Sequence, residues 1–192
     1  MVGLVGLVAA AVAAPPSAVG WVAEVQLGAD PAGVAEVLRR SGATRVEPFG
    51  YRQPGAFARG LLDAPGLLAA LHRAGAAPAL FDGLPEAGPS FVVGEGPDGR
   101  AAYVFVDERL VAFAVTFPAR SVAPHDDPFR RDRLAPLRAT VDALCWGVRP
   151  AERDDYGNVV GWLGERCSGG TLVVRYEPLE PEAALQAVVF RR

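Results

Sequence analysis

Apolar and polar positions first alternate just after residue 20. Every second residue there is small or apolar: Trp21, Ala23, Val25 and Leu27. A period of two is typical of a strand, so the sequence predicts a short strand over 21–27.

Two helices are predicted next from the residues at their ends. The first begins at Asp30 and Pro31, an N-cap followed by a proline in the first turn, and it ends at Gly42. Its apolar stripe consists of Val34, Val37 and Leu38. The same signals predict a second helix over 63–75, and a short strand is predicted over 46–49.

The middle of the chain gives the clearest pattern. Three apolar runs rich in β-branched and aromatic residues predict strands over 91–93, 103–106 and 110–117. The segment 94–99 matches G-x-G-x-x-G, but a strand follows it where a dinucleotide site needs a helix, so we interpret it as a hairpin turn. The polar stretch 118–132 is expected to be a surface loop.

The second half of the chain restarts with a helix. Its apolar residues at helical spacing are Leu134, Leu137, Val141 and Leu144. Because a proline is tolerated only in the first turn, this helix is expected to begin near Asp132. Strands are predicted over 159–166, 171–177 and 185–190, and a helix begun at Pro181 is the alternative for the last of them.

Together these elements predict an α+β fold, an antiparallel β-sheet packed against a few helices. Hairpins of similar composition, over 101–117 and 171–190, each follow a helix, which suggests two related helix-plus-sheet halves. The expected organisation is a signal peptide over 1–18, a first α+β half over 19–118, a linker loop over 119–132 and a second α+β half over 133–192.

The first helix also carries a family resemblance. Its pattern runs through Leu27-Gly28, Val34, Val37-Leu38 and Gly42, and an antiparallel sheet follows. In this pattern the chain resembles the small envelope modules of the outer-membrane assembly lipoprotein and β-lactamase inhibitory protein type, over most of 27–191. The resemblance implies modules in tandem, and it implies protein–protein binding without catalysis. The anchor cysteine of the lipoprotein has no counterpart here.

Residues 1–18 have the composition of a signal peptide. The apolar run from Leu4 to Ala14 is too short to span a bilayer, and 11–13 supplies the small-x-small pattern for cleavage near Ala13. No basic residue precedes the run, and a buried N-terminal helix or strand is the alternative. The sequence thus predicts a periplasmic or secreted protein with no transmembrane segment in the mature chain.

The two cysteines agree with export. Cys145 is expected at the end of the third helix, and Cys167 at the end of a strand that precedes the turn 168–170. A disulfide that ties this helix to the sheet is predicted, and it would contribute roughly 3 kcal/mol in the chain-entropy model. Reduced core cysteines, or a nucleophile and a bystander, are the alternatives.

Composition and charge narrow the function classes. The chain is 51% hydrophobic, and its net charge of −3 offers no basic face for nucleic acid. Residues 125–127 lack further metal ligands nearby, and 154–158 is interpreted as a polar turn rather than a calcium loop, so no metal or other cofactor is expected. A site assembled from Glu24, Glu165 or Glu177 keeps a small hydrolase-like enzyme as an alternative.

Four aromatic residues of the second half form the candidate binding surface, and they are Trp146, Tyr156, Trp162 and Tyr176. Aromatic side chains dominate the energetics of many interfaces. The alternative is that at least two of them fill the core beside the disulfide. The sequence therefore favours a protein-binding module, with another envelope or extracellular protein as its partner. A structural envelope protein is the third hypothesis.

Overall fold

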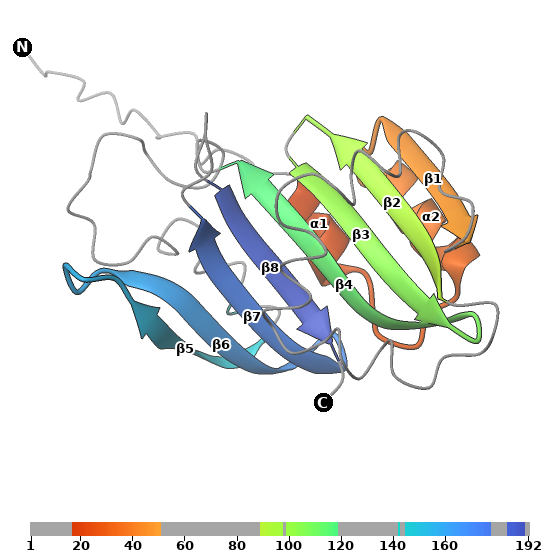
Figure 1. Ribbon diagram of the computed structural model, residues 1–192. Coiled ribbons are helices and arrows are strands. Elements are labelled where there is room, and N and C mark those ends of the chain that lie inside the picture. Colours follow the sequence, from red (N-terminus) through yellow and green to blue (C-terminus); the bar gives the residue numbers. More distant parts are fainter. Residues whose placement is uncertain are drawn as a thin grey trace, which may run out of the picture.

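The computed structural model describes residues 17–50, 89–97, 99–118, 142, 145–177 and 184–190 of the chain. One eight-stranded antiparallel sheet dominates this part, and two short helices pack on one of its faces (Figure 1). The helices are α1 (Ser17–Ala23) and α2 (Pro31–Arg40). The strands are β1 (Arg45–Gly50), β2 (Ser90–Gly96), β3 (Gly99–Val106), β4 (Arg109–Pro118), β5 (Trp146–Arg153), β6 (Val159–Cys167), β7 (Gly170–Glu177) and β8 (Ala184–Phe190).

The sheet consists of two meanders joined by their last strands. Its order is β1-β2-β3-β4-β8-β7-β6-β5, so β1 to β4 form one meander and β5 to β8 form the other. At the seam, β4 and β8 pair antiparallel from Ala112 opposite Phe190 to Pro118 opposite Ala184. This order places β1 and β5 at opposite ends of the sheet, as Figure 1 shows.

The predicted strand over 21–27 is wrong, because α1 extends to Ala23 and a turn follows it. The fully buried side chains of this segment are those of Trp21, Val22 and Val25. Trp21 and Val22 are in α1, whereas Val25 lies just after it, so the buried positions do not follow the period of two of a strand. The alternation of apolar residues did not identify the buried side, since Ala23 and Leu27 are only half-buried.

The helix α2 matches its prediction closely. The Asp30 carboxylate accepts a hydrogen bond from the backbone N–H of Gly33 at 2.9 Å, and this bond lowers the pKa of Asp30 below its ordinary value of 3.8. Leu38 faces the sheet above Gly94 of β2, where an added Cβ would lie 3.1 Å from the Leu38 Cδ1 atom. The first glycine of the G-x-G-x-x-G segment therefore makes room for a helix.

Buried apolar residues form two clusters, on opposite faces of the sheet. Successive residues of β3 alternate between them, because side chains along a strand point to opposite faces: Ala101, Tyr103 and Phe105 join the helix-side cluster. The intervening Ala102 and Val104 belong to the second cluster. The sheet is therefore buried on both faces, which explains the nearly continuous apolar runs of its central strands.

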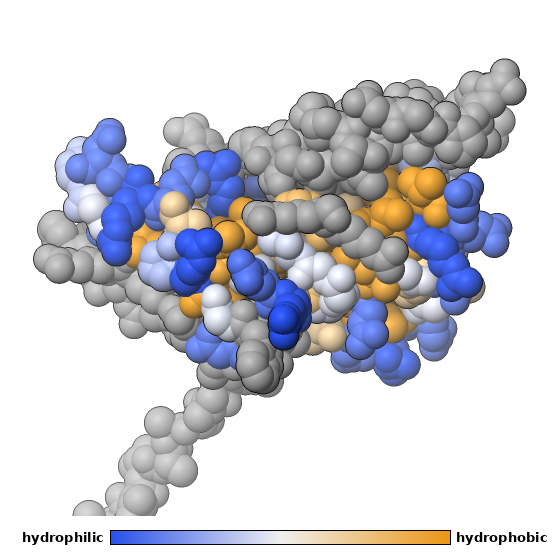
Figure 2. Space-filling model, turned by 90° about the horizontal axis from the view of Figure 1, so that it is seen from below, coloured by the Kyte–Doolittle hydropathy of each residue, from blue (hydrophilic) through white to orange (hydrophobic). Residues whose placement is uncertain are grey.

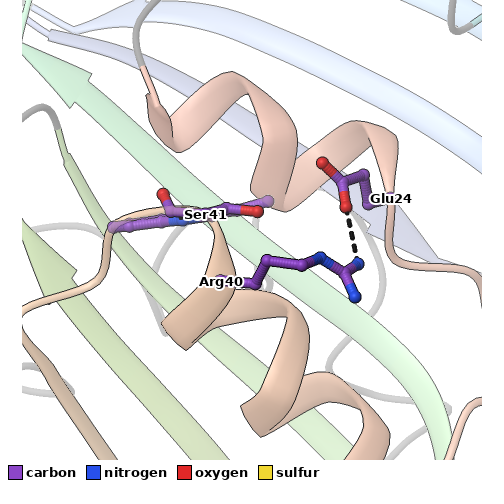
Figure 3. A network of polar contacts seen from close by, with 4 residues as sticks. Glu24, Arg40 and Ser41 are labelled. Atoms are coloured by element: carbon purple, nitrogen blue, oxygen red, sulfur yellow. Dashed lines mark hydrogen bonds and ion pairs between the residues drawn. The ribbon is translucent and has the colours of Figure 1, made fainter.

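The ends of α1 and α2 are tied to one another and to the sheet. The Trp21 Nε1 donates to the Ser41 carbonyl at 3.1 Å, and the buried Tyr103 hydroxyl donates to the Trp21 carbonyl at 2.9 Å. Burial raises the pKa of Tyr103 well above its ordinary value of 10.0. On the outer side, Arg40 and Glu24 form an ion pair at 2.8 Å (Figure 3).

The segment between α1 and α2 contacts both meanders. The Leu27 N–H donates to the carbonyl of Ser168, in the turn between β6 and β7, at 2.9 Å. The Gly28 N–H donates to the carbonyl of Leu110 in β4 at 2.8 Å, and the Leu110 N–H donates to the Ala29 carbonyl at 2.9 Å. One of these backbone bonds attaches the segment to the second meander, and the other two attach it to β4 of the first.

Apart from the one over 21–27, the structure confirms the predicted strands, including the last one, since 184–190 is a strand and not a helix. The segment 94–99 belongs to the β2–β3 hairpin, as predicted: β2 ends at Gly96, which pairs with Gly99 at the start of β3. The predicted helices over 63–75 and from Asp132, the loop 118–132 beyond β4 and most of the signal peptide lie outside the described residues. Among the described helices, none has the length and hydrophobicity needed to cross a membrane.

Candidate functional site

Most of the candidate binding residues lie on the β5–β6 hairpin. Trp146 is in β5, Trp162 is in β6 and Tyr156 is in the turn between these strands, while Tyr176 is in the adjacent β7. The hairpin forms the end of the sheet farthest from α2 (Figure 1). Polar side chains gather at this end in the space-filling view, whereas apolar ones lie nearer the middle (Figure 2).

The four aromatic residues do not form one surface. Trp162 is only 1% exposed and belongs to the helix-side core cluster, and the half-buried Tyr176 packs against the same cluster. Trp162 is therefore a core residue and is removed from the candidate surface. The side chain of Trp146 lies outside the described residues, although its backbone pairs with Glu165. Tyr156 is 92% exposed and is the large hydrophobic side chain that the described surface presents.

The predicted disulfide between Cys145 and Cys167 is present, with the two Cα atoms 4.5 Å apart. Cys145 lies immediately before β5 and Cys167 is the last residue of β6, so the bond joins the two strands at the open end of their hairpin. Both cysteines are buried. An added Cβ at Gly164 would lie 3.0 Å from the Cys167 Sγ, so this glycine makes room for the disulfide on the face of β6.

At the other end of the hairpin, residues 153–158 form a turn that we call the hairpin tip. The Asp154 Oδ1 atom accepts from the backbone N–H groups of Tyr156, at 3.0 Å, and Asn158, at 2.8 Å. The Asp154 Oδ2 atom accepts from the Asn158 side-chain amide at 2.8 Å. Such a carboxylate-centred turn fixes the backbone on both sides of the exposed tyrosine.

Further bonds close the hairpin tip. The backbones of Asp154 and Asn158 pair at 3.0 Å, and the Gly157 N–H donates to the Asp154 carbonyl at 3.0 Å. The Arg153 guanidinium donates to the Gly157 carbonyl at 2.7 Å. Gly157 has a φ of +80°, a conformation that glycine adopts without strain. Tyr156 therefore projects from a backbone that is already held in one conformation.

An ion pair crosses the outer part of the sheet beside the hairpin tip. The Glu152 Oε1 atom of β5 lies 2.6 Å from the guanidinium of Arg175 in β7, so the pair spans the intervening strand β6. Gly161 of β6 lies between the two residues in the register, and an added Cβ there would lie 2.7 Å from the Glu152 Cβ. The absence of a side chain at Gly161 is what allows this contact.

The candidate metal and catalytic residues are placed as follows in the described part of the chain. Both carboxylate oxygens of Asp154 accept hydrogen bonds within the turn, so the interpretation of 154–158 as a polar turn is confirmed. Across the described ranges, no group of three or more His, Cys, Asp or Glu side chains is arranged to hold a metal ion. Glu24 is paired with Arg40 beside α2, whereas Glu165 is in β6. Residues 125–127 and the Glu177 side chain lie outside the described part.

No protein-family model, curated protein or solved structure matches this chain. The candidate site is a hairpin with an exposed tyrosine at its tip and a disulfide at its base.

Proposed function

We propose that this chain is an exported protein-binding module that contacts its partner through the hairpin tip. The observation that carries the proposal is the 92% exposure of Tyr156 on a turn fixed by the Asp154 carboxylate. Tyrosine is enriched at the energetic centres of protein interfaces, and it has only two side-chain torsions to order. A backbone that is ordered before binding loses less conformational entropy in the complex.

Two features support export and tandem modules. A disulfide is typical of oxidising compartments, and the signal-peptide pattern of 1–18 points to the same destination. The two four-stranded meanders, joined at β4 and β8, support the resemblance to envelope modules that occur in tandem. The proposed partner is accordingly another envelope or extracellular protein.

Site-specific photo-crosslinking tests this proposal. A photoreactive amino acid replaces Tyr156 in one variant and Glu36 in a matched control, because Glu36 is also exposed but lies on α2 at the other end of the sheet. In the producing cells, we expect one discrete adduct in the envelope or medium from position 156 and none from position 36. Excess unlabelled wild-type protein should compete for this adduct, whereas the Tyr156→Ala protein should not.

The purified partner then allows a quantitative measurement. For a residue at the energetic centre of an interface, Tyr156→Ala should weaken binding by roughly 30-fold or more, about 2 kcal/mol. Asp154→Ala retains the tyrosine but removes its support, so it should weaken binding by a smaller factor. An unchanged affinity of Tyr156→Ala would contradict the proposal. Adducts of equal yield from both positions, or none from either, would favour the structural envelope protein instead.

A further inference from the structure

The two outermost described strands each contain a proline in a paired position. Pro48 of β1 lies opposite Val92 of β2, and Pro150 of β5 lies opposite Trp162 of β6. Proline has no N–H to donate, so within a sheet it is tolerated where that group would point away from the neighbouring strand. Each of these prolines therefore removes a hydrogen-bond donor from the outer side of its strand. Both prolines are exposed.

Charged side chains accompany both prolines. On β5 the exposed residues around Pro150 include Arg149, Glu152 and Arg153. On β1, Arg45 is exposed and Glu47 is half-buried. A second strand that approached either side would have to desolvate these charged side chains, which is a common way for edge strands to resist pairing.

The backbone of β5 is also irregular. Its pairing with β6 shifts register in three places, between Trp146 and Arg149, between Pro150 and Glu152, and between Glu152 and Arg153. Gly147 has a φ of +74°, outside the extended region. Bulges of this kind bend and twist a strand, so the outer side of β5 is not the flat ladder that another strand needs.

We propose that Pro48 and Pro150 close both ends of the sheet to strand addition. A second copy of the chain then cannot extend the sheet, and neither can an extended peptide from another protein. This inference is independent of the proposed binding function. If both hold, a partner is recognised by side chains such as Tyr156 and not by backbone hydrogen bonds at an edge.

Variants that restore the missing donors test the proposal. The variants are Pro48→Val, Pro150→Val and their combination, since valine supplies an N–H and favours strands. Pro97→Val is the matched control, because Pro97 is an exposed proline in the turn between β2 and β3. Size-exclusion chromatography with light scattering should find the wild type and Pro97→Val monomeric. The double variant should form dimers or larger species that increase with concentration. A folded double variant that stays monomeric over the same range would overturn the proposal, as would edge-to-edge dimers of the wild type.

A peptide probe keeps the test decisive if the double variant fails to fold. The probe is a labelled peptide with the sequence of residues 159–166, a mainly apolar segment of this chain that forms a strand. Fluorescence anisotropy should show at least roughly tenfold tighter binding to Pro150→Val than to the wild type, the effect of about one restored hydrogen bond. A scrambled peptide should bind neither protein. Tight binding of the β6 peptide to the wild type, or equal binding to both proteins, would overturn the proposal.

Discussion

The two ends of the sheet are stabilised by different means. At the β1–β2 end, helices bury large side chains directly on the strands: Leu38 lies on Gly94, and Trp21 lies on Gly96. At the β5–β6 end, a disulfide joins the strands and an ion pair between Glu152 and Arg175 crosses them. Burial of apolar area stabilises the first end, whereas a covalent bond and polar contacts supplement packing at the second.

Because of this difference, the contacts that stabilise the β5–β6 hairpin are distinct from the residue that it exposes at its tip. The disulfide holds the open end of the β5–β6 hairpin, and the hydrogen bonds of Asp154 hold its other end. The hairpin tip can therefore project into solvent without a helix packed over it. A protein whose rigid element is secured at its base is well suited to display one exposed aromatic side chain.

The largest expected effect is at the helix-covered end. Trp21 is fully buried and hydrogen-bonded to Ser41, so Trp21→Ala should lower the free energy of unfolding by about 3–5 kcal/mol. Urea denaturation followed by circular dichroism measures this loss. The control is Tyr156→Ala, whose exposed side chain should change stability by less than about 0.5 kcal/mol. Equal losses in both variants would contradict the division between the two ends.

A smaller and more local effect is expected from the disulfide. The Cys145→Ala/Cys167→Ala protein should lose about 3 kcal/mol in the chain-entropy model. Native-state hydrogen exchange should show the largest loss of protection in β5 and β6, because without the bond this hairpin can open before the rest of the sheet unfolds. Faster exchange spread evenly over both meanders would show that the disulfide stabilises the whole sheet.

Sequence patterns predicted the central strands well, because β2, β3, β4, β7 and β8 contain long apolar runs bounded by turns. The sequence patterns gave a wrong prediction for 21–27 and no prediction for β5. Over 21–27 the apolar residues alternate, but the structure has the end of α1 at Ala23 and buries the adjacent residues Trp21 and Val22. Strand β5 was not predicted, since among its described side chains, residues 147–153, only Val148 is buried, between charged residues and a proline. Such a strand is identified from its pairing with a neighbouring strand, here β6, and not from its own sequence pattern.

The site was predicted in part, for a comparable reason. The disulfide, the polar turn at 154–158 and Tyr156 were identified from local residue types. Which aromatic residues face the core depends on register, and Trp162 faces inward because its pairing with Val174 places both on the helix-covered side. The contact of Glu152 with Arg175 over Gly161 joins three strands, so no local pattern could have indicated it.

The smallest expected effect compares one ion pair from each end. The Arg175 side chain is 31% exposed and pairs with Glu152 at 2.6 Å, whereas Arg40 is 61% exposed and pairs with Glu24 at 2.8 Å. Double-mutant cycles with Glu→Gln and Arg→Met should give couplings below about 1 kcal/mol for both, because both pairs are solvated.

Within that range, we expect the Glu152–Arg175 coupling to be the larger, and the Glu24–Arg40 coupling to fall first as salt is added. Two arguments support this order: the Arg175 guanidinium is less hydrated, and both residues of its pair extend from strands whose register is fixed on either side of Gly161. Glu24, in contrast, lies just after the last turn of α1 and is less constrained. A reversed order would mean that the polar contact adds little at the β5–β6 end. The disulfide and the buried side chains would then hold this end without it.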